Sequence, residues 1–321
     1  NGELPNKKQL KKFEKQERLE RKLSKTLLED IKRFPKKAHP MDVARTAVSI
    51  MGLEDKETKD NSPKANMKKV MRIFAKTPVA LAAFYRTRKG KQIITPKKKF
   101  TFSENFFHMC FGKVPNKEIV KAFDVSLILY AEHSFNVSTF TARTITSSLS
   151  DIHGAITGAI ASLKGPLHGG ANEEVMHMMN KIKKPENALK WINRALDNKD
   201  VVMGFGHRVY KSGDSRVPTM REYFRKVAKI KKDKKFEKIY DIVEKVMIER
   251  KNIHPNVDYP TGPTYHLMGF DTDFFTPIFV ISRITGWSAH IFEQHAANKL
   301  IRPLASYKGN KYRKVSKLNK R

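Results

Sequence analysis

Apolar residues recur at helical spacing along most of the chain. The pattern is clearest in Ile119–Glu132 and Phe236–Arg250, where apolar side chains return every three or four positions. Strict alternation of apolar and polar residues, which is typical of a half-buried strand, is almost absent. The pattern therefore predicts an all-α fold in which the apolar stripes form the core.

Small residues and prolines divide this helical pattern. The stretch Val137–Leu163 is rich in Ser, Thr and Ala, which favours a closely packed helix pair or a helix broken near Gly154 and Gly158. Pro185 suits the first position of a further helix, because that position needs no backbone N–H donor.

Charge is the most unusual global feature of the 321 residues. Lys and Arg total 64 against 32 acidic residues, so the formal net charge is +32. Such a balance attracts polyanions, but no helix-turn-helix, zinc-finger or RNP signature accompanies it. A solvated Lys-rich surface is the favoured interpretation, and nucleic-acid binding is expected only through that basic surface. The basic stretches are Lys7–Lys37, Lys89–Lys99, Lys229–Lys238 and Lys308–Arg321.

Cysteine usage and hydropathy restrict the class of protein further. The single cysteine, Cys110, excludes an internal disulfide and fits a reducing compartment. The most apolar stretch, Phe274–Trp287, is shorter than a membrane span and contains Arg283, so no membrane association is expected. We expect a cytoplasmic protein, or one of the mitochondrial matrix if the source is eukaryotic. His290 and His295 lie five positions apart, which does not suit two ligands on one helical face, so no metal is predicted.

A glycine-rich segment with one histidine precedes a predicted helix. Gly and Pro favour an irregular turn at His168, and Asn172 is a suitable N-cap for a helix with Glu173 and Glu174 in its first turn. The positive end of the helix dipole disfavours a charged imidazole there. A neutral His168 could donate a hydrogen bond to a developing enolate, while a structural turn with an incidental histidine is an equal alternative.

Two further segments carry candidate chemistry. Gly204 and Gly206 allow backbone N–H groups to approach a ligand, and His207 with Arg216 could polarise a carbonyl and pair with a carboxylate. The setting lacks the strand and helix of a dinucleotide fingerprint, so nicotinamide binding is not predicted. Asp258 follows in a turn-rich apolar stretch, where desolvation would raise its basicity. Taken alone, an aspartate in this position is more typical of a residue that only forms a turn.

Taken in this order, the segments resemble the citrate synthase family. The matching motifs are Gly-Pro-Leu-His-Gly-Gly at His168, Gly-Phe-Gly-His-Arg-Val-Tyr at His207, Asn-Val-Asp at Asp258, Ser-Arg-x-x-Gly-Trp at Arg283 and Ile-Arg-Pro at Arg302. The likeness runs from Asn1 to about Lys308. Members usually carry several dozen residues before the position matched by Asn1, so the resemblance implies that an N-terminal part is missing.

The resemblance implies an all-α citrate synthase fold with two helical domains. The large domain would comprise residues 1–168 and 269–321, and the small domain, residues 169–268, would close over the active site. The implied reaction is a Claisen condensation of an acyl-CoA with oxaloacetate, followed by thioester hydrolysis. The CoA thioester is a substrate, so the resemblance implies no cofactor.

Each site residue takes its role from the matched motifs. Asp258 would be the base, His168 the donor to the enolate oxygen and His207 the group that polarises the oxaloacetate ketone. Oxaloacetate carboxylates would be bound by His133, Asn136, Arg216, Arg283 and Arg302, with Arg302 reaching in from the partner of a homodimer. CoA would be bound by the backbone of Val201, Val202 and Gly204 and by Lys211.

Three stretches resemble the 2-methylcitrate synthase branch more than ordinary citrate synthases, namely 131–136, 213–218 and 258–263. They favour propionyl-CoA as the acyl donor, with acetyl-CoA also accepted. One methylene changes discrimination by only about 1–3 kcal/mol, so an ordinary citrate synthase remains an alternative. A non-catalytic, polyanion-binding derivative of the fold is the alternative of another class, and the intact set of His168, His207 and Asp258 argues against it.

Overall fold

A computed structural model describes residues 2–210 and 212–321 of the chain. The described residues form α-helices and short 3-10 turns, with a single isolated bridge between Phe205 and Pro255 in place of any strand. This architecture confirms the predicted all-α fold. The α-helices are α1 (Lys7–Glu20), α2 (Lys25–Arg33), α3 (Pro40–Glu54), α4 (Pro63–Thr87), α5 (Phe102–Phe111), α6 (Lys117–Tyr130), α7 (Val137–Ser147), α8 (Ile152–Leu163), α9 (Ala171–Ile182), α10 (Pro185–Asp197), α11 (Val217–Lys231), α12 (Lys235–Lys251), α13 (Asp258–Met268) and α14 (Phe275–Ala296), and the 3-10 turns are η1 (Thr272–Phe274) and η2 (Leu318–Lys320).

Polar N-cap side chains start many of these helices. Asn116 accepts a hydrogen bond from the backbone N–H of Ile119 at the start of α6, and Asp151 caps α8 through Gly154. Each cap satisfies a backbone donor that the helix itself leaves unpaired. Pro185 occupies the first turn of α10, as predicted.

The Ser/Thr/Ala-rich stretch forms a helix pair, α7 and α8, which are packed against each other. The break lies at residues 148–151, where Leu149 has a φ of 63°, and not at Gly154 or Gly158, which are inside α8. A Cβ at Gly158 would lie 2.2 Å from the side chain of Ile145 in α7. Gly158 therefore allows the two helices to approach. Of the two predicted alternatives, the closely packed helix pair is confirmed and the break near Gly154 and Gly158 is wrong.

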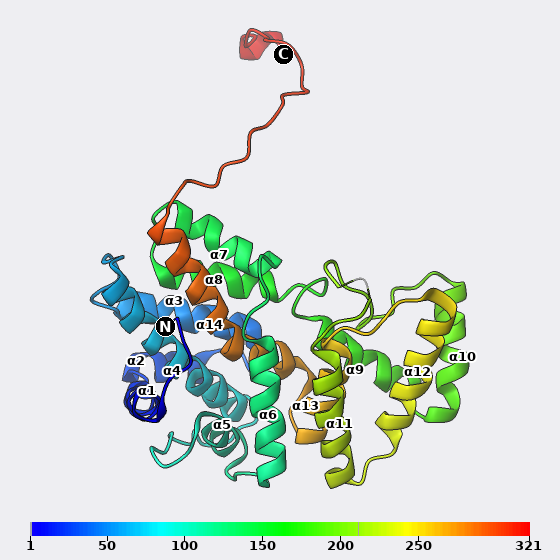
Figure 1. The fold of residues 1–321 in the computed structure, drawn as a ribbon. Helices are drawn as coiled ribbons and strands as arrows, with labels where there is room; N and C mark the ends of the chain where they lie inside the picture. The colour runs from blue at the N-terminus through cyan, green and yellow to red at the C-terminus, as the bar shows by residue number, and fades with distance from the viewer. Residues whose placement is uncertain (1, 211) are drawn as a thin grey trace.

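The long helix α14 is the centre of the core. It packs against α4, α6, α7 and α8, and residues from Phe275 to Ile291 are mostly buried. Figure 1 shows α9, α10 and α12 gathered to one side of these helices, with α11 and α13 between the two groups. Contacts of α11 with α6 join the groups. The domain boundaries at residues 168 and 268 stay a prediction.

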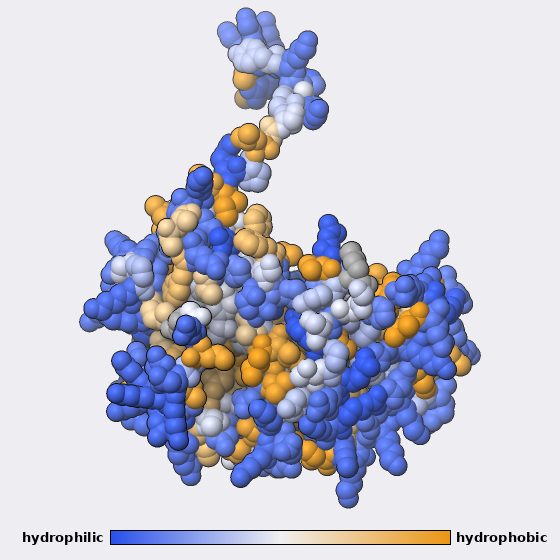
Figure 2. Space-filling model, viewed as in Figure 1, coloured by the Kyte–Doolittle hydropathy of each residue, from blue (hydrophilic) through white to orange (hydrophobic). Residues whose placement is uncertain are grey.

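The chain leaves the helices after α14. Figure 1 shows the C-terminal segment running away from the helical body, and residues 302–321 are exposed. Hydrophilic residues cover most of the face seen in Figure 2 and much of this tail. Among the described residues, no helix is long and apolar enough to cross a membrane.

Candidate active site

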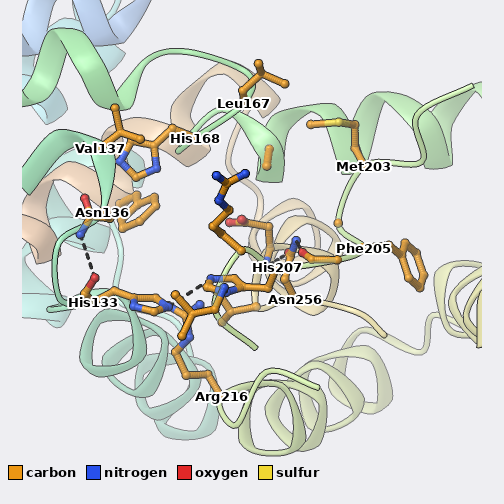
Figure 3. Close-up of a pocket in the computed structure, with 18 of the residues that line it drawn as sticks. His133, Asn136, Val137, Leu167, His168, Met203, Phe205, His207, Arg216 and Asn256 are labelled. Carbon is orange, nitrogen blue, oxygen red and sulfur yellow. Dashed lines mark hydrogen bonds between the residues drawn. The ribbon is translucent and has the colours of Figure 1, made fainter. Parts of the chain in front are cut away.

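A cavity of about 520 Å³ is lined by residues from both groups of helices. It is bounded by the end of α6, by the turn between α8 and α9, by the starts of α7, α11 and α13, and by the middle of α14. Ten residues predicted from the sequence line it: His133, Asn136, His168, Val201, Val202, Gly204, His207, Arg216, Asp258 and Arg283. Figure 3 shows how His133, His168, His207 and Arg216 are grouped around the same space.

The turn that carries His168 is built from glycine. A Cβ at Gly169 would lie 2.6 Å from the carbonyl oxygen of Leu163, so only glycine allows the chain to fold back on the end of α8. Gly170 is the N-cap of α9, and because glycine has no side chain, no side-chain hydrogen bond caps this helix. The expectation that Asn172 caps this helix is wrong, because Asn172 lies inside α9 and is fully buried.

Hydrogen bonds assign the neutral tautomer of His168. Its Nε2 atom accepts the backbone N–H of Ser138 at 3.3 Å and lies 2.8 Å from the Ser138 hydroxyl. Burial, and then the charge of Arg283, lowers the pKa of His168 to about 4. The single ring proton at neutral pH is therefore on Nδ1. Trp287 donates to the Ser138 hydroxyl at 3.0 Å and so holds the serine in place against His168.

Asp258 is the first residue of α13. Its backbone N–H donates to the side chain of Asn256 at 3.1 Å, and the Tyr130 hydroxyl donates to its carboxylate at 2.5 Å. Desolvation by the surrounding protein raises the pKa of Asp258 to about 6, while the Tyr130 hydrogen bond and the charge of Arg216 act in the opposite direction. The carboxyl lines the cavity, so the residue is only partly covered. It is a base of raised strength that is still ionised above pH 6.

His133 and His207 form a stacked pair. Their ring centroids are 4.9 Å apart, and their Nε2 atoms approach to 3.1 Å, the contact drawn as a dashed line in Figure 3. The backbone N–H groups of Val209 and Tyr210 donate to Nδ1 of His207, which places its proton on Nε2. Burial, followed by the charge of Arg216, lowers the pKa of His133 to about 4. His133 is therefore neutral at neutral pH, and its Nε2 faces the Nε2–H of His207.

Two arginines supply the positive charge of the site. Arg216 is held by the buried carboxylate of Asp214, to which Nε and Nη2 donate at 2.9 and 2.7 Å. Arg283 is 1 % exposed, and its Nε donates to the carbonyl of Tyr130 at 2.6 Å. Its Nη1 is buried without a hydrogen-bond partner among the described residues. A buried guanidinium with an unused donor at a cavity wall suits an anionic ligand.

The glycine segment pairs with the chain that leads into Asp258. Gly206 donates to the carbonyl of His254 at 2.8 Å, and Asn256 donates to the carbonyl of Gly204 at 2.9 Å. Gly204 has a φ of 85°, and a Cβ there would lie 2.6 Å from Val175. The pairing sets the position of His207 relative to Asp258, and it leaves Val201 exposed beside the cavity.

Three predicted site residues differ from the others in their placement or present contacts. Asn136 lines the cavity, but it is the N-cap of α7, and its amide already donates to His133 and Thr139. Arg302 is exposed on the C-terminal segment and is not among the lining residues. Lys211 lies outside the described residues. The roles of these three residues stay predictions.

Sequence reasoning missed several residues that support the site. Tyr130, Ser138, Asp214 and Asn256 each hydrogen-bond to a predicted site residue or to its backbone. The sequence held a local signal for two of them. Asp214 lies two positions before Arg216 and Asn256 two before Asp258, which is the spacing at which an Asp or Asn side chain accepts a hydrogen bond from the backbone in an Asx turn. Nothing local pointed to Tyr130 or Ser138.

The family described as "Citrate synthase, C-terminal domain" matches residues 1–304. The chain belongs to the citrate synthase family. It is 52 % identical over 325 residues to 2-methylcitrate synthase 2 of Corynebacterium glutamicum, a match that covers 100 % of this chain and 85 % of that protein. It is 49 % identical over 314 residues to a citrate synthase of Mycolicibacterium smegmatis, covering 98 % and 84 %.

Solved structures agree with the fold. A citrate synthase from Thermoplasma acidophilum, in ternary complex with carboxymethyl coenzyme A and oxaloacetate, superposes with a TM-score of 0.93 at 32 % identity. The match covers 100 % of this chain and 86 % of that one. The predicted citrate synthase fold is confirmed. Among the described residues, no group of three or more His, Cys, Asp or Glu side chains is placed to hold a metal ion.

Proposed function

We propose that the protein condenses an acyl-CoA with oxaloacetate and hydrolyses the resulting thioester, with propionyl-CoA giving 2-methylcitrate and acetyl-CoA giving citrate. The observation that carries the proposal is the convergence of a raised-pKa carboxylate, a neutral imidazole and an unpaired buried guanidinium on one cavity. Membership of the citrate synthase family supports the same reaction class.

Asp258 and His168 would form the nucleophile. Asp258 takes a proton from the acyl carbon next to the thioester carbonyl, and its raised pKa makes it a stronger base than an exposed aspartate. The N–H at Nδ1 of neutral His168 donates to the carbonyl oxygen, where negative charge develops. The low pKa of His168 keeps this donor neutral near pH 7, so it stabilises the enolate by a hydrogen bond from a neutral imidazole.

The enolate carbon would then attack the ketone of oxaloacetate. Nε2–H of His207 would exchange its contact with Nε2 of His133 for the ketone oxygen, and donate to that oxygen as it becomes an alkoxide. Arg216 and Arg283 bind the two carboxylates, Arg283 through its unused Nη1. Because Arg216 already gives Nε and Nη2 to Asp214, it would meet the substrate through its remaining Nη1 edge. His133 would add a neutral hydrogen bond.

CoA would lie along the exposed edge of the glycine segment. The backbone of Val201, Val202 and Gly204 lines the open side of the cavity and could receive the adenine, with Lys211 proposed for a phosphate. After condensation, water attacks the thioester carbonyl, the carbon–sulfur bond breaks, and CoA leaves as the thiol.

Arg302 would complete the site of a second subunit. Its exposure on a segment that leaves the helical body fits a contact made with a partner of a homodimer. Mixing Arg302→Ala and Asp258→Ala subunits tests this. A mixed dimer would hold one intact site, with recovery of about a quarter of wild-type activity in a random mixture. Equal inactivity of the mixture and of its components would contradict the shared site.

The first test of the proposed function is loss of thioester absorbance with oxaloacetate and either propionyl-CoA or acetyl-CoA, compared as kcat/KM. A higher value for propionyl-CoA supports the 2-methylcitrate branch. A higher value for acetyl-CoA supports an ordinary citrate synthase. The 49 % identity to the citrate synthase of Mycolicibacterium smegmatis favours this alternative. Absence of turnover with both would reject the proposal. His168→Ala and Asp258→Ala should each abolish turnover, and near-full activity in either would reject its role.

A further inference from the structure

The Tyr130 hydroxyl and the Asp258 carboxylate join two elements that are distant in sequence. Tyr130 is the last residue of α6, Asp258 is the first residue of α13, and the hydroxyl donates to Oδ1 at 2.5 Å. Both side chains line the same cavity. The contact therefore lies at the residue proposed to remove the substrate proton.

Tyr130 is held firmly in this orientation. Its side chain is fully buried, and its ring packs on Phe279 of α14 with centroids 4.0 Å apart. Its carbonyl accepts Nε of Arg283 at 2.6 Å, which fixes the backbone at the same point. A fully buried ring that packs on Phe279, on a backbone held by Arg283, cannot swing its hydroxyl away from Asp258 without disturbing α14.

The hydroxyl acts as a donor and not as a second acid. Burial, and then the nearby charge of Asp258, raises the pKa of Tyr130 well above its ordinary value. The phenol therefore keeps its proton at neutral pH. A hydrogen bond donated to a carboxylate favours the ionised form.

The other charged groups that face Asp258 act differently. Arg216 and Asp214 approach from the segment before α11, the former lowering and the latter raising the pKa of Asp258, and Arg283 lowers it from α14. These groups act through charge, at any orientation of the carboxylate. The Tyr130 hydrogen bond is directional, so it can select one oxygen.

We propose that Tyr130 is a positioning residue for the base: it fixes Oδ1 of Asp258, leaves Oδ2 to face the acyl carbon and favours the ionised carboxylate. In the proton transfer the carbon–hydrogen bond breaks, Oδ2 receives the proton, and Tyr130 keeps its own. The inference rests on the proposed function.

The test compares Tyr130→Phe with Tyr265→Phe. Tyr265 is a matched control, because it is also buried, lies in α13 itself and donates its hydroxyl to Ser126 instead of Asp258. For Tyr130→Phe we expect kcat to fall by about 10- to 100-fold and the acid limb of the kcat/KM profile to move upward by about one pH unit. The KM for oxaloacetate should change little.

An isotope effect separates positioning from a loss of packing. With acyl-CoA deuterated at the reacting carbon, a slower proton transfer in Tyr130→Phe should raise the kinetic isotope effect on kcat. Tyr265→Phe should match the wild type in all three readouts. A wild-type profile and isotope effect in Tyr130→Phe, or equal changes in the control, would overturn the inference.

A direct titration keeps the inference testable apart from the activity. The ¹³C carboxyl signal of Asp258, assigned by its loss in Asp258→Asn, reports the pKa without turnover. Tyr130→Phe should raise that pKa by about one unit and Tyr265→Phe should not. If the wild type turns over neither acyl-CoA while the titration shifts as expected, the proposed function fails and the Tyr130–Asp258 coupling stands. An unshifted titration rejects the coupling itself.

Discussion

The carboxylate of Asp214 holds the guanidinium of Arg216 through two hydrogen bonds of 2.9 and 2.7 Å. The same carboxylate accepts the backbone N–H of Val257 at 3.0 Å, directly before Asp258. Asp214 thus connects an arginine proposed to bind oxaloacetate with the start of the helix that carries the proposed base. Arg216, in turn, keeps the pKa of Asp214 below its ordinary value against the effect of burial.

Asp214→Asn should lower both stability and oxaloacetate affinity. Removing one partner of a buried charge pair leaves the other uncompensated, which costs about 3–5 kcal/mol of the free energy of unfolding. Chemical unfolding and the KM for oxaloacetate measure the two effects, and we expect KM to rise at least about tenfold.

Asp241→Asn is the control for that change. Asp241 pairs with Arg225 on the surface and should cost less than about 1 kcal/mol. Similar losses in the two variants would contradict the special role of the buried pair.

The pH dependence of Asp258 links activity and stability with opposite signs. Its pKa of about 6 lies above the unfolded value, so the folded protein binds more protons between about pH 4 and 6, and its stability falls as pH rises through this window. Asp258→Asn removes this cost. It should raise the free energy of unfolding at pH 7 by up to about 3 kcal/mol while abolishing turnover.

Unfolding of the wild type and Asp258→Asn at pH 4 and pH 7 checks this sign. The difference in stability should be largest at pH 7 and should nearly vanish near pH 4. The wild-type kcat/KM should fall below about pH 6 as Asp258 becomes protonated. A variant that is less stable than the wild type at pH 7 would show that burial does not raise this pKa.

Arg283→Met should separate binding from stability. The guanidinium is buried with an unpaired Nη1, and burial lowers its pKa to about 10. Replacing it with an apolar side chain of similar length should leave stability unchanged or raise it by about 1–3 kcal/mol. The KM for oxaloacetate should rise by about 100-fold or more, because a carboxylate loses its charged donor. Thermal unfolding without ligand and steady-state kinetics measure these effects, and a strongly destabilised variant would refute the assignment.

Gly204→Ala should destabilise the glycine segment. Gly204 has a φ of 85°, and its Cβ would meet Val175 at 2.6 Å and Tyr259 at 2.9 Å. Strain and overpacking together should cost about 2–4 kcal/mol. Gly90→Ala is a matched control, because its φ is 68° but no atom lies within 4 Å, so only about 1 kcal/mol is expected. Equal losses in denaturant unfolding would indicate that backbone strain alone matters.

Candidate site residues with a strong local signature could be proposed from the sequence alone. His168, His207 and Asp258 each lie in a short segment where glycine, proline or asparagine shapes the backbone, and the cavity brings all three together. Helix type and order followed from the spacing of apolar residues, because a 3.6-residue period is a property of consecutive positions. The family could likewise be identified from ordered motifs.

What the tertiary structure decided are the contacts between distant segments. Nothing in the sequence around Tyr130 indicates a role, and only the packing of α13 places Asp258 against its hydroxyl. Ser138 likewise contacts His168 only because the turn after α8 lies beside it. The break between α7 and α8 was likewise set by how two helices pack, since Gly158 serves their close approach. Hydrogen bonds and desolvation depend on distances in space, which a linear pattern does not contain. The sequence therefore determined the helices and the chemical groups, and packing decided which groups touch and how strongly each holds its proton.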